Sequence, residues 1–471
     1  MIARGMSLRT LHRLVAALVR EGLATGVSEG RRLVVKTPGC TAHVMFRGRN
    51  PAWPHPSEIR GGLRLGRRVI QDPVEYLSLC RLDWPWESIN ALSTRLRNCV
   101  EHAALSEVFR RKTPSPGDNA LAWEAAQVGG DPLHVLHRAR TGITMPHAYL
   151  WAPEMGGFTD LCFHRGPVQA TGPFHDLLSD WLPEPDVLPV HPAQAIARGH
   201  DPGEIERPLP VEAMRWAGVP LQVQEERQQY GQVCFHGATI RGSFGEDRRR
   251  AWSQQDFRSV CPDGLPYTLV LSLPARCPDE RPLGDLTEVL ERSQRLRDAL
   301  GDRIVPELAT GFVYALGCIV RERATGIPLA SLEERDDEGA PVARRLGGDA
   351  AWFHRHTQQL MDALLPPLAD GIVLGVGRQD VLVGPDGVRV RNLGATGGSH
   401  WRVFNTLIGH LDNLRRVLAL PPLDLEPELR ARLPASIAND WMADRVPMHC
   451  VVRSELEGRP VQRLGFNPLR G

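Results

Sequence analysis

The densest group of chemically useful side chains lies between Gly129 and Gly142, where the sequence reads GGDPLHVLHRARTG. Asp131 suits the N-cap of a helix, the proline after it suits the first turn, and the closing glycine can end the helix. The spacing predicts a helix of about two to three turns. His134 and Arg138 would share one face, because residues four apart on a helix are neighbours. We interpret the segment as an anion-binding site, since backbone N–H groups and the helix dipole favour negative charge at a helix N-terminus.

Two other interpretations of this segment stay open. Its basic residues could form an ordinary solvated face, which is the usual role of such a cluster. His134 and His137 could form a metal-binding pair, but no third ligand lies nearby in the sequence. We therefore expect no metal site here.

A second candidate is Arg241, which lies at the end of an expected strand in the stretch GATIRGSF. A guanidinium group in this position can bind a carboxylate or a phosphate through two parallel hydrogen bonds. An ordinary surface charge is the alternative, because nearly all of the 56 basic residues of the chain are arginines.

The composition excludes several classes of protein. The 56 basic and 55 acidic residues nearly cancel over 471 residues, so no global charge favours nucleic acid or an anionic membrane. Lys36 and Lys112 are the only lysines. A P-loop, a kinase-type strand lysine and a pyridoxal phosphate Schiff base are therefore excluded from the sequence after residue 112.

The cysteines and the hydropathy indicate a cytoplasmic protein. The nine cysteines are scattered and never form a CxxC pair, which is typical of reduced, buried thiols and favours neither a zinc site nor a disulfide framework. No stretch reaches about 18 apolar residues, and the N-terminus lacks the pattern of a secretion signal. We expect no membrane span.

The length of 471 residues predicts two or three structural units, and the hydrophobic periodicity predicts both helices and strands. Helices are expected over residues 7–23, 73–110, 288–300, 307–326 and 351–370. Strands are expected over 219–276 and 371–398, the latter as a hairpin with Pro-Asp-Gly at its turn. The first helix and the basic strand after it also match the outline of a winged-helix DNA-binding domain. No helix-turn-helix precedes that helix, and we expect no nucleic-acid partner.

The order of residues from 129 to 142 resembles the GHPxHPxxKxRxG motif of the NRPS-independent siderophore (NIS) synthetases, the aerobactin synthetase or IucA/IucC family. The residues in register with this motif are Gly130, Pro132, His134, Arg140 and Gly142, with Glu124 at the upstream glutamate. Three positions differ: Asp131 replaces the first histidine, Val135 the second proline and Arg138 the lysine.

Later segments resemble the same family in the same order. HAYLWAPEMG contains the family's Ala-Pro-Glu, and LPVHPAQ resembles its P-x-H-P-W-Q, with His191 at the histidine. GATIRGSF resembles S-x-R-T, with Thr239 at the serine and Arg241 at the arginine. YTLVLSLPARCPDER resembles a strand followed by an arginine, which is Arg281 or Arg276 here.

The hairpin expected over 371–398 resembles the family's L-E-x-H-x-Q-N and R-D strands. Gly375 stands at the glutamate and Gly377 at the histidine, so two functional side chains are missing. The remaining positions of the two strands are Gln379, Asp380, Arg391 and Asn392, the last of which replaces an aspartate.

The resemblance implies the fold of an NIS synthetase, an α+β cupped hand of three parts. These parts would be a mainly helical thumb over 1–118, β-rich fingers over 119–285, and a mixed α/β palm over 286–471 that is helical with a β-hairpin. The family commonly forms homodimers, and we expect the same of this chain.

The resemblance also implies a reaction, in which ATP and Mg²⁺ adenylate a polycarboxylate and an amine or alcohol then displaces AMP. It assigns catalytic roles to Arg241 and His134. The residues that it assigns to nucleotide binding are Arg138, Arg140, Thr239, Arg281, Gln379, Asp380, Arg391 and Asn392. It leaves the metal ligands unassigned, because the replacements at Gly375 and Asn392 remove both candidate carboxylates.

Two hypotheses of different classes follow. The first is an ATP-dependent acid–amine ligase whose site has been rebuilt around arginine, with altered or weakened activity. The second is a catalytically inactive relative that binds a small anion or pairs with an active synthetase. The replaced lysine, histidine and carboxylates separate the two only weakly, since charge-assisted contacts can be supplied by other groups.

Overall fold

The computed structural model describes residues 2–470 with several internal gaps. The residues outside the description are 110–113, 115–119, 128, 141–147, 149–150, 156–158, 193–204, 209–228, 231–232, 237–238, 243–248, 254–258, 272–285, 314–315, 337–339, 385–386, 392–398 and 422–423. In the strands and helices within 205–250, at 252–253, over 286–289 and at 121, 292 and 299, the backbone is described but the side chains are not.

An N-terminal unit combines three helices with an antiparallel five-stranded meander, β1-β2-β3-β4-β5. The helices are α1 (Ile2–Arg20), α2 (Pro73–Cys80) and α3 (Trp86–Val108). The strands are β1 (Thr25–Glu29), β2 (Arg32–Lys36), β3 (Thr41–Phe46), β4 (Ile59–Leu65) and β5 (Arg68–Ile70). The periodic leucines of α1, including Leu11, Leu14 and Leu18, are fully buried and hold this unit together. The helices expected over 7–23 and 73–110 are confirmed.

The side chain of Asp72 caps the N-terminus of α2. The Asp72 carboxylate accepts hydrogen bonds from the N–H groups of Val74 and Glu75, both at 2.8 Å. We expect Asp72→Ala to lower the free energy of unfolding by about 1 kcal/mol, the usual cost of losing such a cap. Urea denaturation would measure this. Asp83→Ala is the control, because no hydrogen bond or ion pair of the exposed Asp83 is seen within the described residues, and an equal loss there would contradict the assignment.

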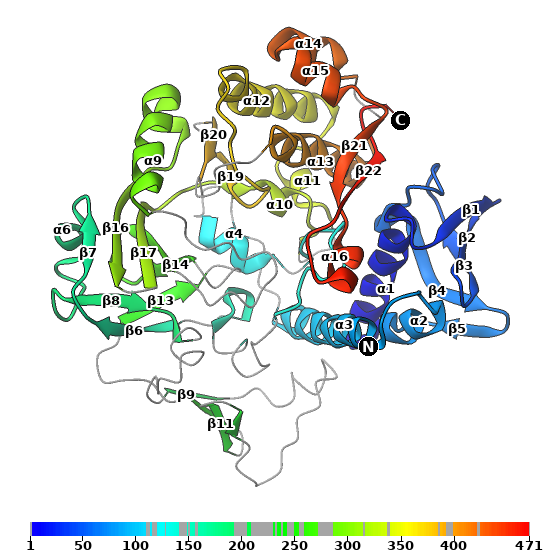
Figure 1. The fold of residues 1–471 in the computed structure, drawn as a ribbon, viewed down its shortest axis with the longest axis horizontal. Helices are drawn as coiled ribbons and strands as arrows, with labels where there is room; N and C mark the ends of the chain where they lie inside the picture. Colours follow the sequence, from blue (N-terminus) through cyan, green and yellow to red (C-terminus); the bar gives the residue numbers. More distant parts are fainter. Residues whose placement is uncertain are drawn as a thin grey trace.

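The middle of the chain forms an antiparallel eight-stranded sheet in the order β7-β16-β17-β15-β14-β13-β6-β8. Its strands are β6 (Thr159–Arg165), β7 (Gln169–Thr171), β8 (Val187–Val190), β13 (Arg249–Ser253), β14 (Ser259–Pro262), β15 (Tyr267–Leu271), β16 (Glu307–Val313) and β17 (Leu316–Glu322). Helix α6 (Phe174–Leu178) and helix α9 (Leu286–Leu300) lie against this sheet, as Figure 1 shows. A smaller four-stranded sheet comprises β9 (Ile205–Pro208), β10 (Gln229–Tyr230), β11 (Val233–His236) and β12 (Thr239–Gly242).

The helix expected over 307–326 is wrong, because these residues form β16 and β17. Nearly every residue of β17 is buried, so the segment shows a continuous apolar run instead of the alternation of a half-exposed strand. A run of this kind cannot be distinguished from a buried helix by its periodicity. Strands β16 and β17 come after residue 285, where the predicted fingers end. They belong to the same sheet as strands that come before this residue, so the sheet extends across the predicted boundary between fingers and palm.

The C-terminal unit is built around two long helices. Its helices are α10 (Leu329–Leu332), α11 (Val342–Arg345), α12 (Ala350–Ala369), α13 (Trp401–Leu418), α14 (Glu426–Arg432), α15 (Ala435–Trp441) and α16 (Val451–Glu457). Its strands are β18 (Ile327–Pro328), β19 (Val381–Gly384), β20 (Gly387–Val390), β21 (Arg445–His449) and β22 (Gln462–Phe466). Helix α16 packs against α3 and α1, which joins this unit to the N-terminal unit (Figure 1).

The expected hairpin over 371–398 is confirmed in part. Strands β19 and β20 pair antiparallel, but β19 begins at Val381, so Gly375, Gly377, Gln379 and Asp380 precede the strand. The helix expected over 351–370 is confirmed as α12. No helix in the described part of the chain has the length and apolar character that a membrane span requires.

Candidate functional site

The segment Gly129–Arg140 forms a series of turns, so the predicted helix is wrong here. The N–H groups of His134, His137 and Ala139 donate to carbonyl groups three residues earlier, at 3.2, 3.3 and 2.9 Å. The Asp131 carboxylate accepts from Leu133 N–H at 2.8 Å, which is the local bond expected of a cap. Ion pairs to distant parts of the chain fix the segment, and they override its helix propensity.

The predicted anion-binding arginines of this segment bind a carboxylate of the protein itself. Arg140 Nη2 lies 2.6 Å from Glu154 Oε1, and Arg138 Nη1 lies 3.8 Å from the same oxygen. Ser106 Oγ donates to this oxygen at 2.9 Å, and Glu154 is fully buried. Burial alone would raise the pKa of the Glu154 carboxyl, but the two guanidinium groups lower it to about 2. Glu154 is therefore ionised. Its negative charge offsets much of the positive charge of the two arginines that the resemblance assigns to nucleotide binding.

A second buried ion pair connects this segment to the hairpin. Arg391 forms a close ion pair with Glu124, and its Nη2 also donates to the Gln379 carbonyl at 2.9 Å. Gln379 Nε2 donates to Gln127 Oε1 at 2.9 Å, and the Gln127 carbonyl accepts from Arg138 Nη2 at 2.5 Å. The structure thus brings Arg138, Arg391 and Gln379 together, as the sequence predicts. It does so through Gln127, which no sequence pattern indicated.

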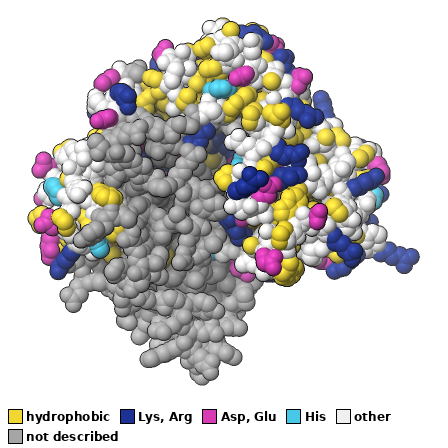
Figure 2. Space-filling view, in the orientation of Figure 1, with side chains coloured by type: hydrophobic (Ala, Val, Ile, Leu, Met, Phe, Trp, Pro, Cys, Tyr) yellow, Lys and Arg dark blue, Asp and Glu magenta, His cyan; other side chains and the backbone are white. Residues whose placement is uncertain are grey.

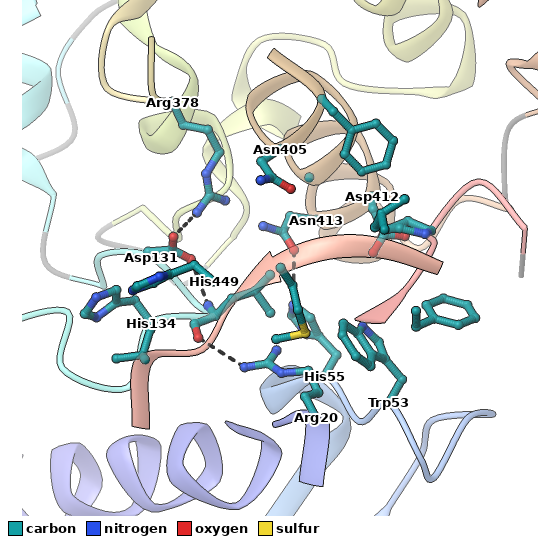
Figure 3. Close-up of a pocket in the computed structure, with 18 of the residues that line it drawn as sticks. Arg20, Trp53, His55, Asp131, His134, Arg378, Asn405, Asp412, Asn413 and His449 are labelled. Carbon is teal, nitrogen blue, oxygen red and sulfur yellow. Dashed lines mark hydrogen bonds and ion pairs between the residues drawn. The ribbon is translucent and has the colours of Figure 1, made fainter. Parts of the chain in front are cut away.

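His134 faces a different space, a cavity of about 370 Å³ on the far side of the Asp131–His134 turn. The cavity lies between the end of α1, the 53–55 loop, α13 and strands β21 and β22 (Figure 3). Its charged and histidine residues are Arg20, Glu21, His55, Asp131, His134, Arg378, Asp412, Arg416 and His449. The proposed catalytic residue His134 is therefore accessible to a small molecule, in contrast to the buried arginine network.

Arg378 anchors the turn to the wall of this cavity. Its guanidinium forms a close ion pair with Asp131 and a second with Glu333 at 2.6 Å. Burial alone would raise the pKa of the Asp131 carboxyl, but Arg378 holds it below its usual range. Burial raises the pKa of the Glu333 carboxyl to about 7, even though Arg378 lowers it. His410 Nδ1 lies 2.8 Å from Glu333 Oε1, and burial lowers the pKa of His410 to about 3, so the histidine is neutral.

Four of the predicted site residues cannot be placed by their side chains. Thr239 and Arg241 lie on β12, whose backbone pairs with β11 and β9, but their side chains are outside the description. Arg281 and Asn392 lie outside the described residues altogether. The convergence of Arg241 with Arg138 therefore stays a prediction.

A magnesium site does not emerge from the described residues. The Asp380 carboxylate accepts from Gly377 N–H at 2.8 Å. Among the residues that the structure describes, no group of three or more His, Cys, Asp or Glu side chains could hold a metal ion. Mg²⁺ usually keeps several waters and is held by one or two carboxylates together with the phosphates of the substrate, so such a site needs few side chains.

The arrangement of sheets and helices is that of a known class of enzymes. The chain superposes along its whole length on solved structures of NIS synthetases, and it has the NIS synthetase fold. Aerobactin synthetase IucC from a hypervirulent pathotype of Klebsiella pneumoniae gives a TM-score of 0.68 at 15% identity, covering 100% of this chain and 98% of that one. ATP-bound aerobactin synthetase IucA from the same source gives 0.66 at 15%, covering 98% and 99%. The petrobactin biosynthesis protein AsbB from Bacillus anthracis gives 0.71 at 13%, covering 100% and 96%. The sequence matches no family model and no curated protein.

Proposed function

We propose that the protein is an ATP-dependent ligase of the NIS synthetase type, with altered or weakened activity. The full-length likeness to siderophore synthetases carries the proposal, since one of the similar structures is an ATP-bound synthetase. The packing of the Gln127–Arg140 segment against Gln379 and Arg391 supports it, because the family motifs meet at one place.

In this reaction a carboxylate oxygen of the substrate attacks the α-phosphorus of ATP and pyrophosphate leaves. An amine or alcohol then attacks the acyl carbon, and AMP leaves. Both steps develop negative charge that fixed cations must stabilise. Because Glu154 offsets Arg140 and Glu124 offsets Arg391, we assign these arginines a positioning role. The phosphate-binding role then falls to Arg241 and Arg281.

The alternative proposal is a catalytically inactive relative that acts as a binding or partner protein. Two observations favour it: the glutamate and histidine positions hold Gly375 and Gly377, and the described arginines of the motif already bind internal carboxylates. Such a protein could form a homodimer or associate with an active synthetase. Sedimentation of the purified chain alone and with a synthetase would measure either assembly.

The two proposals are separated by a hydroxamate assay. Purified protein would be incubated with ATP, Mg²⁺, hydroxylamine and a panel of polycarboxylates. A ligase produces hydroxamate that depends on both ATP and one acid. No product with any acid, together with no ATP binding by calorimetry, would contradict the ligase and leave the inactive relative.

The side chain of Gln379 provides a more specific test of the nucleotide site. This side chain donates to Gln127, which lies next to the motif segment. The resemblance assigns Gln379 to nucleotide binding. We expect Gln379→Ala to raise the Kd for ATP about five- to tenfold, the effect of losing one neutral hydrogen bond. Titration calorimetry would measure it. Gln294→Ala, on the exposed face of α9, is the control and should leave the Kd unchanged; equal effects of both variants would exclude Gln379 from the site.

A further inference from the structure

Arg20, the last residue of α1, lines the cavity of Figure 3, and no described carboxylate forms an ion pair with its guanidinium. Glu21 and Asp131 attract it only from a longer distance. Arg20 Nη2 donates to the Leu133 carbonyl at 3.1 Å, and its buried Nε has no hydrogen-bond partner. Burial lowers the pKa of Arg20, which reflects the cost of keeping the charge there. A charge in this situation is stabilised by an anion from outside the chain.

The other basic side chains that line the cavity already have partners. Arg378 pairs with Asp131, and Arg416 pairs with Asp412 at 3.0 Å and Glu58 at 2.7 Å. Their charges are largely offset before any ligand enters. Among the described basic residues of the cavity, Arg20 is therefore the one that lacks a carboxylate.

The acidic side chains of the cavity limit how much negative charge a ligand can carry. The Glu21 carboxylate accepts from the N–H groups of Val452 and Arg453, at 3.1 and 2.8 Å, and it does not pair with Arg20. Asp131 and Asp412 also line the cavity. Asp131 and Asp412 are paired with arginines, so the one guanidinium without a described ion pair matches a ligand with a single negative charge.

The rest of the lining is suited to an apolar ring. Trp53, Phe404 and Phe466 line the same cavity, and the ring centroids of Trp53 and Phe466 lie 5.9 Å apart. Met448 lies beside them in the lining. A volume of about 370 Å³ falls in the range of small-molecule sites, which combine apolar walls with a few polar groups that fix orientation. Figure 3 shows Trp53 and His55 beside Arg20 at the same side of the cavity.

We propose that this cavity binds a small aromatic monocarboxylate, with its carboxylate on Arg20 and its ring among Trp53, Phe404 and Phe466. The carboxylate would accept hydrogen bonds from the part of the guanidinium that lines the cavity. The proposal goes beyond ligase activity, because binding at this cavity needs no nucleotide.

Calorimetric titration of the full-length protein without ATP tests the charge and ring requirements. The probes are benzoate, the neutral benzamide, the non-aromatic cyclohexanecarboxylate and citrate. We expect benzoate to bind, benzamide to bind at least tenfold more weakly, cyclohexanecarboxylate to bind more weakly than benzoate, and citrate not to compete. No benzoate binding, or equal affinity for benzoate and benzamide, would overturn the proposal. Competition by citrate would overturn the restriction to a single charge.

Substitution of Arg20 locates the site. We expect Arg20→Met, which keeps the apolar stem, to weaken benzoate binding at least tenfold, and Arg20→Lys to weaken it less. Arg9→Met is the matched control, because Arg9 lies on the exposed face of the same helix. Equal affinity of Arg20→Met and Arg9→Met would overturn the assignment. If Arg20→Met does not fold, as judged by circular dichroism, the benzoate affinities of Arg20→Lys and Arg9→Met are compared instead. Equal affinities of these two variants would overturn the assignment. The titration contains no ATP, so the absence of benzoate binding would not contradict the ligase proposal. In the same way, the absence of hydroxamate would not contradict the aromatic monocarboxylate site.

Discussion

Replacing Glu154 with alanine is expected to lower the free energy of unfolding by about 3 to 5 kcal/mol, because it leaves buried guanidinium charge without its carboxylate. Glu154 has no exposed surface, and Arg138 and Arg140 are nearly as buried. The energy of such a pair is dominated by desolvation, so removing one partner costs far more than the pair contributes. Urea denaturation monitored by circular dichroism would measure the loss. A loss below about 1 kcal/mol would contradict this account of the network.

Two further variants separate charge from packing in this prediction. Glu154→Gln keeps the shape and an acceptor for Ser106 and Arg140 but removes the charge, so it should recover only part of the loss. Glu184→Ala breaks an ion pair of similar length, 2.8 Å, whose side chains are 72% and 49% exposed. Surface pairs of this kind contribute about 0 to 1 kcal/mol. A loss at Glu184 as large as that at Glu154 would show that burial does not set the cost.

The sequence predicted the helices α1, α2, α3, α9 and α12 because their apolar residues recur at helical spacing. Helix α1 is an example, since Leu11, Leu14 and Leu18 face one core. The same reasoning failed over β16 and β17, where burial on both sides removes the alternation that marks a strand. It also failed over Gly129–Arg140, whose conformation is set by ion pairs to residues that a local pattern cannot reveal.

The proximity of some candidate residues was predictable, but their electrostatic surroundings were not. The resemblance assigned Arg138, Arg140 and Arg391 to one site. In the structure Arg138 is linked to Arg391 through Gln127 and Gln379, and to Arg140 through Glu154. Nothing in the sequence indicated that Glu154 and Glu124 would form ion pairs with these arginines. Arg20 was missed for the opposite reason, because a basic residue in the last turn of a helix is common and usually solvated. On the described part of the face shown in Figure 2, basic, acidic and hydrophobic side chains are intermixed.

Replacing Arg378 with methionine is expected to destabilise the protein by about 3 to 5 kcal/mol at pH 8 and by less at pH 6, because it leaves the buried Glu333 without its cation. The Asp131 side chain is 41% exposed, so water stabilises its charge and it contributes less. The pH dependence comes from Glu333. In the unmodified protein its pKa is raised from 4.5 to about 7, so stability is highest when it is protonated and falls as the pH rises from about 4.5 to 7. Without Arg378 the folded-state pKa of Glu333 rises further, and the variant continues to lose stability above pH 7, by up to about 1.4 kcal/mol per pH unit.

Urea denaturation of both proteins from pH 6 to pH 8.5 would measure this difference. Arg389→Met is a matched control on β20, because its ion pair with Glu322 is partly exposed and should contribute less than about 1 kcal/mol at any pH. Adding Glu333→Gln to Arg378→Met removes the titrating group, so the double variant should lose the additional pH dependence. A loss that is independent of pH would show that Glu333 does not take up the proton.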